Sequence, residues 1–223
     1  MRRLSRLMTG IAMLALLAGG CGSTGGAGGD DALVLQFIQW DNTGLTQADS
    51  VGQSSADVDV VQDLCPPDGT PEPFTQTEIN AIFKNNEGSV ILLQSYSTQI
   101  GDPRLSQANI TNGVLSASIP GKTCGGTGAP CFIDSDCALG VVGSCQPTET
   151  TVSGIVLFDF LGKAVIQTVS LAHPEVLGQV TPLTVTFSGS DPNRSFQVSA
   201  SYLVTFGDFD NCMTPTGGGA GAL

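Results

Sequence analysis

Side chains that commonly carry out catalysis are scarce in this sequence. Its 223 residues include one histidine and one tryptophan, and the hydrolase motifs Gly-x-Ser-x-Gly and His-Glu-x-x-His are both absent. A hydrolase needs a nucleophile that an adjacent base activates. His173 precedes Pro174 in an expected loop, with no serine or cysteine motif around it. The sequence therefore predicts a protein that is not an enzyme and has no cofactor.

Positive charge is also scarce. The chain has 8 lysines and arginines against 20 aspartates and glutamates. Three of the arginines, Arg2, Arg3 and Arg6, lie in the first 20 residues, which leaves 5 basic against 20 acidic residues, about −15, for the remainder. A surface this acidic repels phosphate backbones and anionic headgroups. We therefore expect no nucleic-acid partner and no docking to a membrane through charge.

The N-terminal hydrophobic run is too short to cross a bilayer. Residues 7–18 form an apolar run of 12 residues, whereas a spanning helix needs about 20. The three arginines precede this run, and Leu17-Ala18-Gly19-Gly20-Cys21 follows the pattern of a cleavage site. The segment resembles the lipobox signal of bacterial lipoproteins, although its leucine stands one step earlier than usual. That resemblance implies a signal peptide at 1–20 and a lipidated Cys21, which would anchor the protein to a membrane.

Segments rich in glycine flank the expected domain. Residues 21–31 have no large apolar side chain to bury and are expected to form a flexible tether, and residues 213–223 are expected to form a disordered tail. In lipoproteins the residue after the lipidated cysteine influences sorting, and Gly22 favours the outer membrane. The periplasmic or surface side stays open. A single domain is expected over residues 32–212.

Short apolar runs that alternate with polar residues dominate this domain. Their content of Val, Ile, Phe and Thr, with Gly, Pro, Asn and Asp between them, predicts antiparallel β-structure. Residues 195–206 alternate for twelve positions, and Ile79, Ala81 and Phe83 alternate with polar neighbours. Residues 163–171 are predicted as a short helix, although their β-branched content favours a strand. The apolar positions with helical spacing are Leu161, Ala164, Val165, Thr168 and Val169. The expected strands are 33–40, 58–64, 77–84, 89–98, 113–119, 151–158, 180–188 and 195–206.

The succession of strands and turns resembles an immunoglobulin-like β-sandwich. The predicted fold class is therefore all-β, an antiparallel immunoglobulin-like sandwich with a small disulfide-rich insert. The closing segments Thr-Phe-Ser-Gly-Ser-Asp and Val-Thr-Phe-Gly-Asp-Phe are similar to those of uncharacterised envelope lipoproteins. This similarity covers the last third of the chain and carries no catalytic motif. A fold of this kind hosts many functions, so it implies none by itself.

Six cysteines other than Cys21 make an even number, which in an exported protein indicates disulfides. They are Cys65, Cys124, Cys131, Cys137, Cys145 and Cys212. Four of them lie close together within an insert at 120–148, which has too many glycines and prolines to form a core and therefore needs covalent bonds. Their connectivity stays open. By elimination, the remaining two cysteines, Cys65 and Cys212, are expected to pair with each other.

No metal site is predicted. Zinc usually binds cysteine pairs two to four residues apart, and the gaps in the insert are longer. Calcium favours carboxylates clustered on loops, as in Asp134 with Asp136, or Asp208 and Asp210 with Asn211, but solvated loop charges explain both groups. Nor does the sequence place any pair of carboxylates at the separation that a glycosidase needs. Trp40 is expected to pack in the core rather than to bind sugar.

These features together favour a lipid-anchored cell-envelope protein that works as a non-catalytic binding or interaction module. A membrane, reached through the lipid, and an unknown protein are the expected partners. One alternative is a structural or accessory subunit of an envelope assembly, since sandwich domains offer loops and sheet edges to partners. The other is a calcium-dependent or hydrolytic envelope enzyme.

Overall fold

The structure is a computed structural model that describes residues 33–41, 50–51, 55–62, 64–65, 69–71, 75–137 and 144–209. Several predictions lie outside the described residues: the signal peptide, Cys21, the tether, the tail and Cys212. The side chains of Trp40 and Cys65 lie outside them too, so the pairing of Cys65 with Cys212 stays a prediction. No helix in the described part of the chain is long and apolar enough to pass through a membrane.

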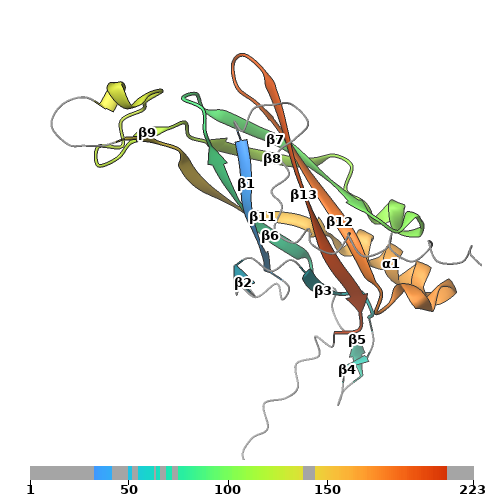
Figure 1. Cartoon of the computed structure of the whole chain (residues 1–223). Coiled ribbons are helices and arrows are strands. Elements are labelled where there is room, and N and C mark those ends of the chain that lie inside the picture. Colours follow the sequence, from blue (N-terminus) through green and yellow to red (C-terminus); the bar gives the residue numbers. More distant parts are fainter. Residues whose placement is uncertain are drawn as a thin grey trace, which may run out of the picture.

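Two sheets pack face to face (Figure 1). The first sheet has four strands in the order β11-β6-β1-β2. They are β1 (Leu33–Asp41), β2 (Ser50–Val51), β6 (Thr77–Asn85) and β11 (Thr148–Phe158). Every second residue of β6 is buried, including Ile79, Ala81 and Phe83, which confirms the predicted alternation. Strand β1 lies between β6 and β2.

The second sheet has five strands in the order β3-β13-β12-β7-β8. They are β3 (Ser55–Asp59), β7 (Ile91–Ile100), β8 (Gly113–Ile119), β12 (Val180–Ser190) and β13 (Ser195–Gly207). The hairpin of β12 and β13 pairs without a register shift, from Val180 opposite Thr205 to Ser190 opposite Ser195. Strand β3 runs parallel to β13, so this one pair departs from the expected antiparallel pattern.

The strand order is that of an immunoglobulin-like sandwich. Strands A, B and E of that fold correspond to β1, β6 and β11. Strands C, C′, F and G correspond to β7, β8, β12 and β13. With these letters the sheets read A-B-E and G-F-C-C′. These are the orders of a variable-type immunoglobulin domain in which the described residues form no strand C″ or D. The connection from C′ to E, where D would lie, holds the cysteine-rich insert. This topology confirms the predicted fold class.

A helix replaces the short turn between strands E and F. Helix α1 (Phe160–Ala172) is longer than the predicted helix and begins after Asp159, whose side chain accepts a hydrogen bond from the N–H of Gly162. Asp159 is therefore an N-cap. The 3-10 helix η3 (Pro174–Val176) follows α1, and η1 (Pro103–Ala108), which links β7 to β8, packs beside α1.

The buried face of α1 differs from the face that its apolar residues predict. Leu161 is 77% exposed, whereas Lys163 is 1% exposed and Gly162, Ile166 and Ser170 are buried with it. A Cβ at Gly162 would lie 3.4 Å from the carbonyl oxygen of Ala108 in η1. The same Cβ would lie 3.3 Å from Oδ1 of Asp159, so a large side chain at this position would crowd the N-cap and the contact with η1.

One predicted strand is in the wrong place. The structure divides the segment predicted as 58–64 between β3 and β4 (Leu64–Cys65), and β4 pairs with β5 (Thr70–Pro71). Val58 and Val60 are buried, but the chain crosses from one element to the next between them and Leu64, which is exposed. The run of apolar residues thus belongs to two elements.

Candidate functional site

The described chain holds two groups of residues with recognisable chemistry, at opposite ends of the sandwich (Figure 1). One is the cysteine-rich insert, whose elements are β9 (Thr123–Cys124), η2 (Asp134–Cys137) and β10 (Cys145–Gln146). The other is a group of ionisable side chains where η1, α1 and η3 meet the start of β12.

All four cysteines of the insert are in disulfides. Cys124 bonds to Cys137, and Cys131 bonds to Cys145. The sulfur atoms of Cys124, Cys131 and Cys137 lie within 4.8 Å of one another, a spacing that a metal could share. Zinc binds thiolates, however, and sulfurs that form disulfides cannot supply them. The structure settles the connectivity that the sequence left open.

The carboxylates of the insert hold its backbone. Asp136 accepts hydrogen bonds from the N–H groups of Phe132 and Ile133, at 2.8 and 3.1 Å, and these bonds lower the pKa of its carboxyl group. Asp134 accepts one from the N–H of Cys145, at 2.8 Å. Holding the backbone of the insert is therefore an alternative to calcium binding as the role of Asp134 and Asp136. Asp208 is exposed, and its neighbours Asp210 and Asn211 lie outside the described residues.

The insert packs onto the turn between β6 and β7. The N–H of Lys122 donates to the carbonyl of Glu87 at 2.8 Å. The ring of Phe132 lies over Gly88, where a Cβ would be 2.0 Å from its Cδ1 atom, yet Phe132 remains 66% exposed. The predicted insert thus contacts the sandwich through Lys122 and Phe132, and much of the Phe132 ring faces solvent.

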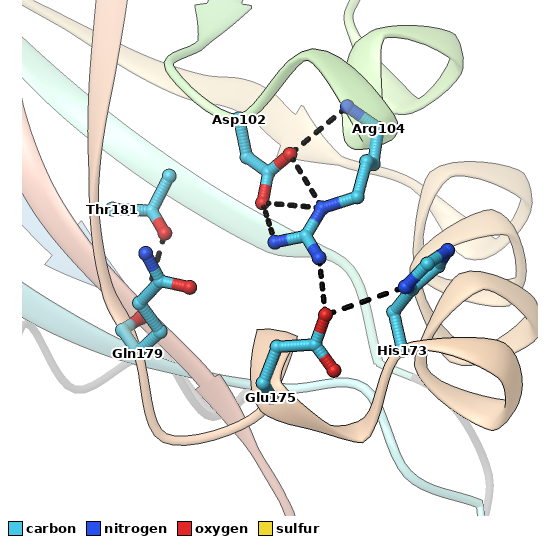
Figure 2. Close-up of polar contacts among 6 residues, drawn as sticks. All are labelled: Asp102, Arg104, His173, Glu175, Gln179 and Thr181. Carbon is cyan, nitrogen blue, oxygen red and sulfur yellow. Dashed lines mark hydrogen bonds and ion pairs between the residues drawn. The ribbon is translucent and has the colours of Figure 1, made fainter.

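At the other end, Arg104 lies between two carboxylates (Figure 2). Its Nε atom is 3.0 and 3.1 Å from the two oxygens of Asp102, and one terminal nitrogen is 2.6 Å from Asp102 Oδ2. The other terminal nitrogen is 2.5 Å from Oε1 of Glu175. His173 Nδ1 is 3.3 Å from the same oxygen. Arg104 therefore joins the loop after β7 to the segment after α1.

These contacts shift the ionisation of the three charged groups. The hydrogen bond from the Arg104 side chain is the main cause that lowers the pKa of Asp102, which is mostly buried. The N–H of Glu175 itself, followed by Arg104, lowers the pKa of the Glu175 carboxyl. The pKa of Arg104 is raised, chiefly by Asp102. The cluster thus favours two carboxylates around one guanidinium, with a net negative charge when His173 is neutral.

A shallow, open hollow of about 460 Å³ adjoins this cluster. A Cβ at Gly101 would lie 2.4 Å from the ring of Pro182, so glycine permits the close approach of the two segments there. The hydroxyl of Thr181 points to the Gln179 carbonyl at 3.5 Å. The lining residues are Gly101, Asp102, Pro103, Arg104, Gln179, Val180, Thr181 and Pro182.

The geometry of this cluster does not assemble a nucleophile with a base. The ring of His173 contacts Glu175 rather than a hydroxyl or a thiol. Arg104 is already neutralised by two carboxylates, which disfavours an anionic substrate. Sequence reasoning missed Asp102, Arg104 and Glu175. The order Asp-Pro at 102–103 signals a helix start, but nothing in the sequence links it to a residue 71 positions away.

Comparisons with known proteins do not assign a family. No family model matches the sequence, and no curated protein matches it either. Among solved structures, the chain is similar to the CooA pilin subunit from enterotoxigenic Escherichia coli, with 14% identity over 77% of this chain and 97% of that chain. The TM-score is 0.21. A similarity this low carries no argument about fold or function.

Proposed function

We propose that this protein is a lipid-anchored protein of the cell envelope and acts as a non-catalytic interaction module. The observation that carries the anchor is the N-terminal order of features: three arginines, an apolar run of 12 residues, then Leu17-Ala18-Gly19-Gly20-Cys21. A lipid on Cys21 is the anchor that suits a chain whose remaining residues are this acidic, because anionic headgroups repel such a surface. Gly22 favours the outer membrane as its location.

The side chains of the ionisable cluster support a non-catalytic role. Asp102, Arg104 and Glu175 bind one another, and His173 contacts Glu175. Catalytic groups are usually placed to reach a reacting atom in a cleft that excludes water. Here the adjoining hollow is shallow and open. The cluster therefore suits a structural role, in which its ion pairs hold η1 against η3.

A structural or accessory subunit of an envelope assembly is the second candidate. One specific observation favours it: the four adjacent strands β13, β12, β7 and β8 contain no charged residue in a chain of net charge −12. A surface without charge can meet another protein without a desolvation penalty for ions. Both candidates share the lipid anchor and differ in whether the partner is a permanent neighbour.

Membrane attachment tests the proposal directly. The Cys21→Ala variant of the full chain should not incorporate radiolabelled palmitate and should no longer be cleaved after Gly20. After export it should not be recovered in the outer-membrane fraction at the wild-type level. Ser23→Ala, two residues away, is the matched control and should behave as the wild type. Equal palmitate labelling of Cys21→Ala and the wild type would refute the lipid anchor.

A further inference from the structure

The two large sheets have four edge strands in the described part of the chain, and one of these strands differs from the rest. Strand β3 carries Asp57 and Asp59 at its edge, and β2 has two residues. Strand β11 carries the exposed Glu149 and has two register shifts with β6, one of them around Gly154 with φ of 71°. Charges, short length and bulges are the devices that prevent edge strands from pairing with other chains. The fourth edge, β8, is seven residues long and carries no charge and no proline, and its one register shift with β7 falls between Val114 and Ala117.

The surroundings of β8 are also uncharged. All 17 residues from Leu105 to Gly121 lack Asp, Glu, Lys, Arg and His, and so does the neighbouring strand β7. Val114, on the outer face of β8, is 88% exposed. Within the described part of the chain, β7 is the strand that pairs with β8, and no strand pairs with its other edge. An uncharged backbone edge with an exposed valine is therefore available for pairing.

Net charge indicates which partner such an edge suits. Each chain carries a formal charge of −12, so two copies repel each other wherever they present carboxylates. The β8 edge lets two copies approach with no like charges opposed along the strand. A strand that pairs antiparallel with its own copy is self-complementary about a two-fold axis, which is the commonest symmetry of homodimers.

The sequence of β8 also allows such a pair in register. Although its pairing with β7 shifts once, exposure alternates along all of β8, with Val114, Ser116 and Ser118 outward. An antiparallel register centred on Ser116 keeps inward residues opposite inward ones, because residues directly opposite in a ladder share a face. That register places Gly113 opposite Ile119, Val114 opposite Ser118, Leu115 opposite Ala117 and Ser116 opposite Ser116.

We propose that two copies of this chain associate through antiparallel pairing of their β8 strands, centred on Ser116, to form one continuous sheet across both sandwiches. The interface is small, so the dimer is expected to be weak in solution. Copies confined to one membrane would raise its occupancy, because confinement increases the effective concentration. The proposal goes beyond the anchored module described above and does not require the lipid.

Charge reversal at Ser116 tests this register. The purified full chain, in detergent with many micelles per chain, is examined by sedimentation velocity from roughly 10 µM to 1 mM, the range of weak interfaces. The wild type should shift from monomer to dimer over this range. Ser116→Lys and Ser116→Glu should each remain monomeric, because like charges would lie directly opposite. An equimolar mixture of the two variants should restore the dimer.

Ser201→Lys, on the outer face of the interior strand β13, is the matched control and should dimerise as the wild type. Thermal unfolding of each variant verifies that the exposed substitution leaves the fold intact. A wild type that stays monomeric at the highest concentration overturns the proposal, including the case in which β8 instead receives a strand from a different protein. A dimer that survives Ser116→Lys, or a mixture that stays monomeric, overturns the β8 register.

Discussion

The ring of Phe83 meets the ring of Phe187 edge-on, with centroids 5.0 Å apart and planes at 88°. Both residues are fully buried. Phe83 lies on β6 and Phe187 on β12, the strands B and F that a disulfide joins in antibody domains, where a tryptophan of strand C covers the bond. Here the ring of Tyr96, on β7 or strand C, has its centroid 6.3 Å from that of Phe187. Three aromatic side chains thus occupy the region of the usual disulfide and tryptophan.

This aromatic pair should contribute strongly to stability. Phe83→Ala should lower the free energy of unfolding by about 3–5 kcal/mol, because it removes a buried ring and leaves a cavity. Chemical denaturation measures the change. Phe132→Ala removes a ring that is largely exposed and is the control, with a smaller loss expected. A loss for Phe83→Ala no larger than the control would contradict this prediction. The Phe83→Ala/Phe187→Ala double variant should lose less than the sum of the single losses.

Tyr96 links the two sheets by a hydrogen bond. Its hydroxyl donates to the carbonyl of Val156 in β11 at 2.7 Å. Tyr96→Phe keeps the ring but leaves that carbonyl without this donor, so the free energy of unfolding should fall by about 1 kcal/mol. Tyr202→Phe removes the tyrosine hydroxyl of β13 in the same sheet, and its free energy of unfolding is the matched comparison. An unchanged denaturation midpoint for Tyr96→Phe would show that water replaces the lost donor at no cost.

The Asp102–Arg104 pair should make stability depend on acid pH. Because the pKa of Asp102 is lowered in the folded chain, its stabilising effect is complete above the unfolded pKa of about 3.9. The effect is lost as the pH falls through the lower folded pKa. From pH 5 to pH 2 the wild type should therefore lose more unfolding free energy than Asp102→Asn. Arg104→Gln should also flatten this dependence, since Arg104 is the main cause of the shift. Parallel curves for all three proteins would show that the pair contributes nothing.

The insert should be dispensable for folding of the sandwich. Replacing residues 124–145 with a short Gly-Ser connector should leave a cooperative thermal transition and β-type circular dichroism, because loop length changes closure entropy slowly. Its two disulfides close loops of 13 and 14 residues and should each stabilise the insert by about 3 kcal/mol in the chain-entropy model. Loss of the cooperative transition would instead make the insert part of the core. The deletion also removes the contact of Phe132 with Gly88 and the hydrogen bond from the N–H of Cys131 to the carbonyl of Lys122.

Most of the sheet could be predicted from the sequence. The alternation in β6, β12 and β13 reports which face is buried, because side chains of a strand point alternately to opposite faces. Strand β8 has the predicted bounds. The prediction of one strand at 58–64 was wrong because two short elements share one apolar run. Parallel pairing of β3 with β13 leaves no local signal, since it depends on where the chain crosses between sheets.

The ionisable cluster could not be predicted, because it depends on contacts between distant segments. Asp102 and Arg104 lie two residues apart, but β8, the insert, β11 and α1 separate Arg104 from Glu175 along the chain. Which face of α1 is buried could not be predicted for the same reason. An isolated pattern places Leu161 inward and Lys163 outward, whereas in the structure Leu161 is exposed and Lys163 is buried.

By itself the sequence determined the chemical character of this protein: its acidity, the alternation that produces a β-sandwich, the even number of cysteines in the insert and the absence of common catalytic motifs. These properties are local or compositional, so folding does not change them. The tertiary structure alone decided the disulfide pairing, the partners of Arg104 and which strand became the uncharged edge. The partners of Arg104 and the edge position of β8 depend on which distant segments become neighbours when the two sheets bury their faces against each other. The disulfide pairing depends on the path of the chain within the insert.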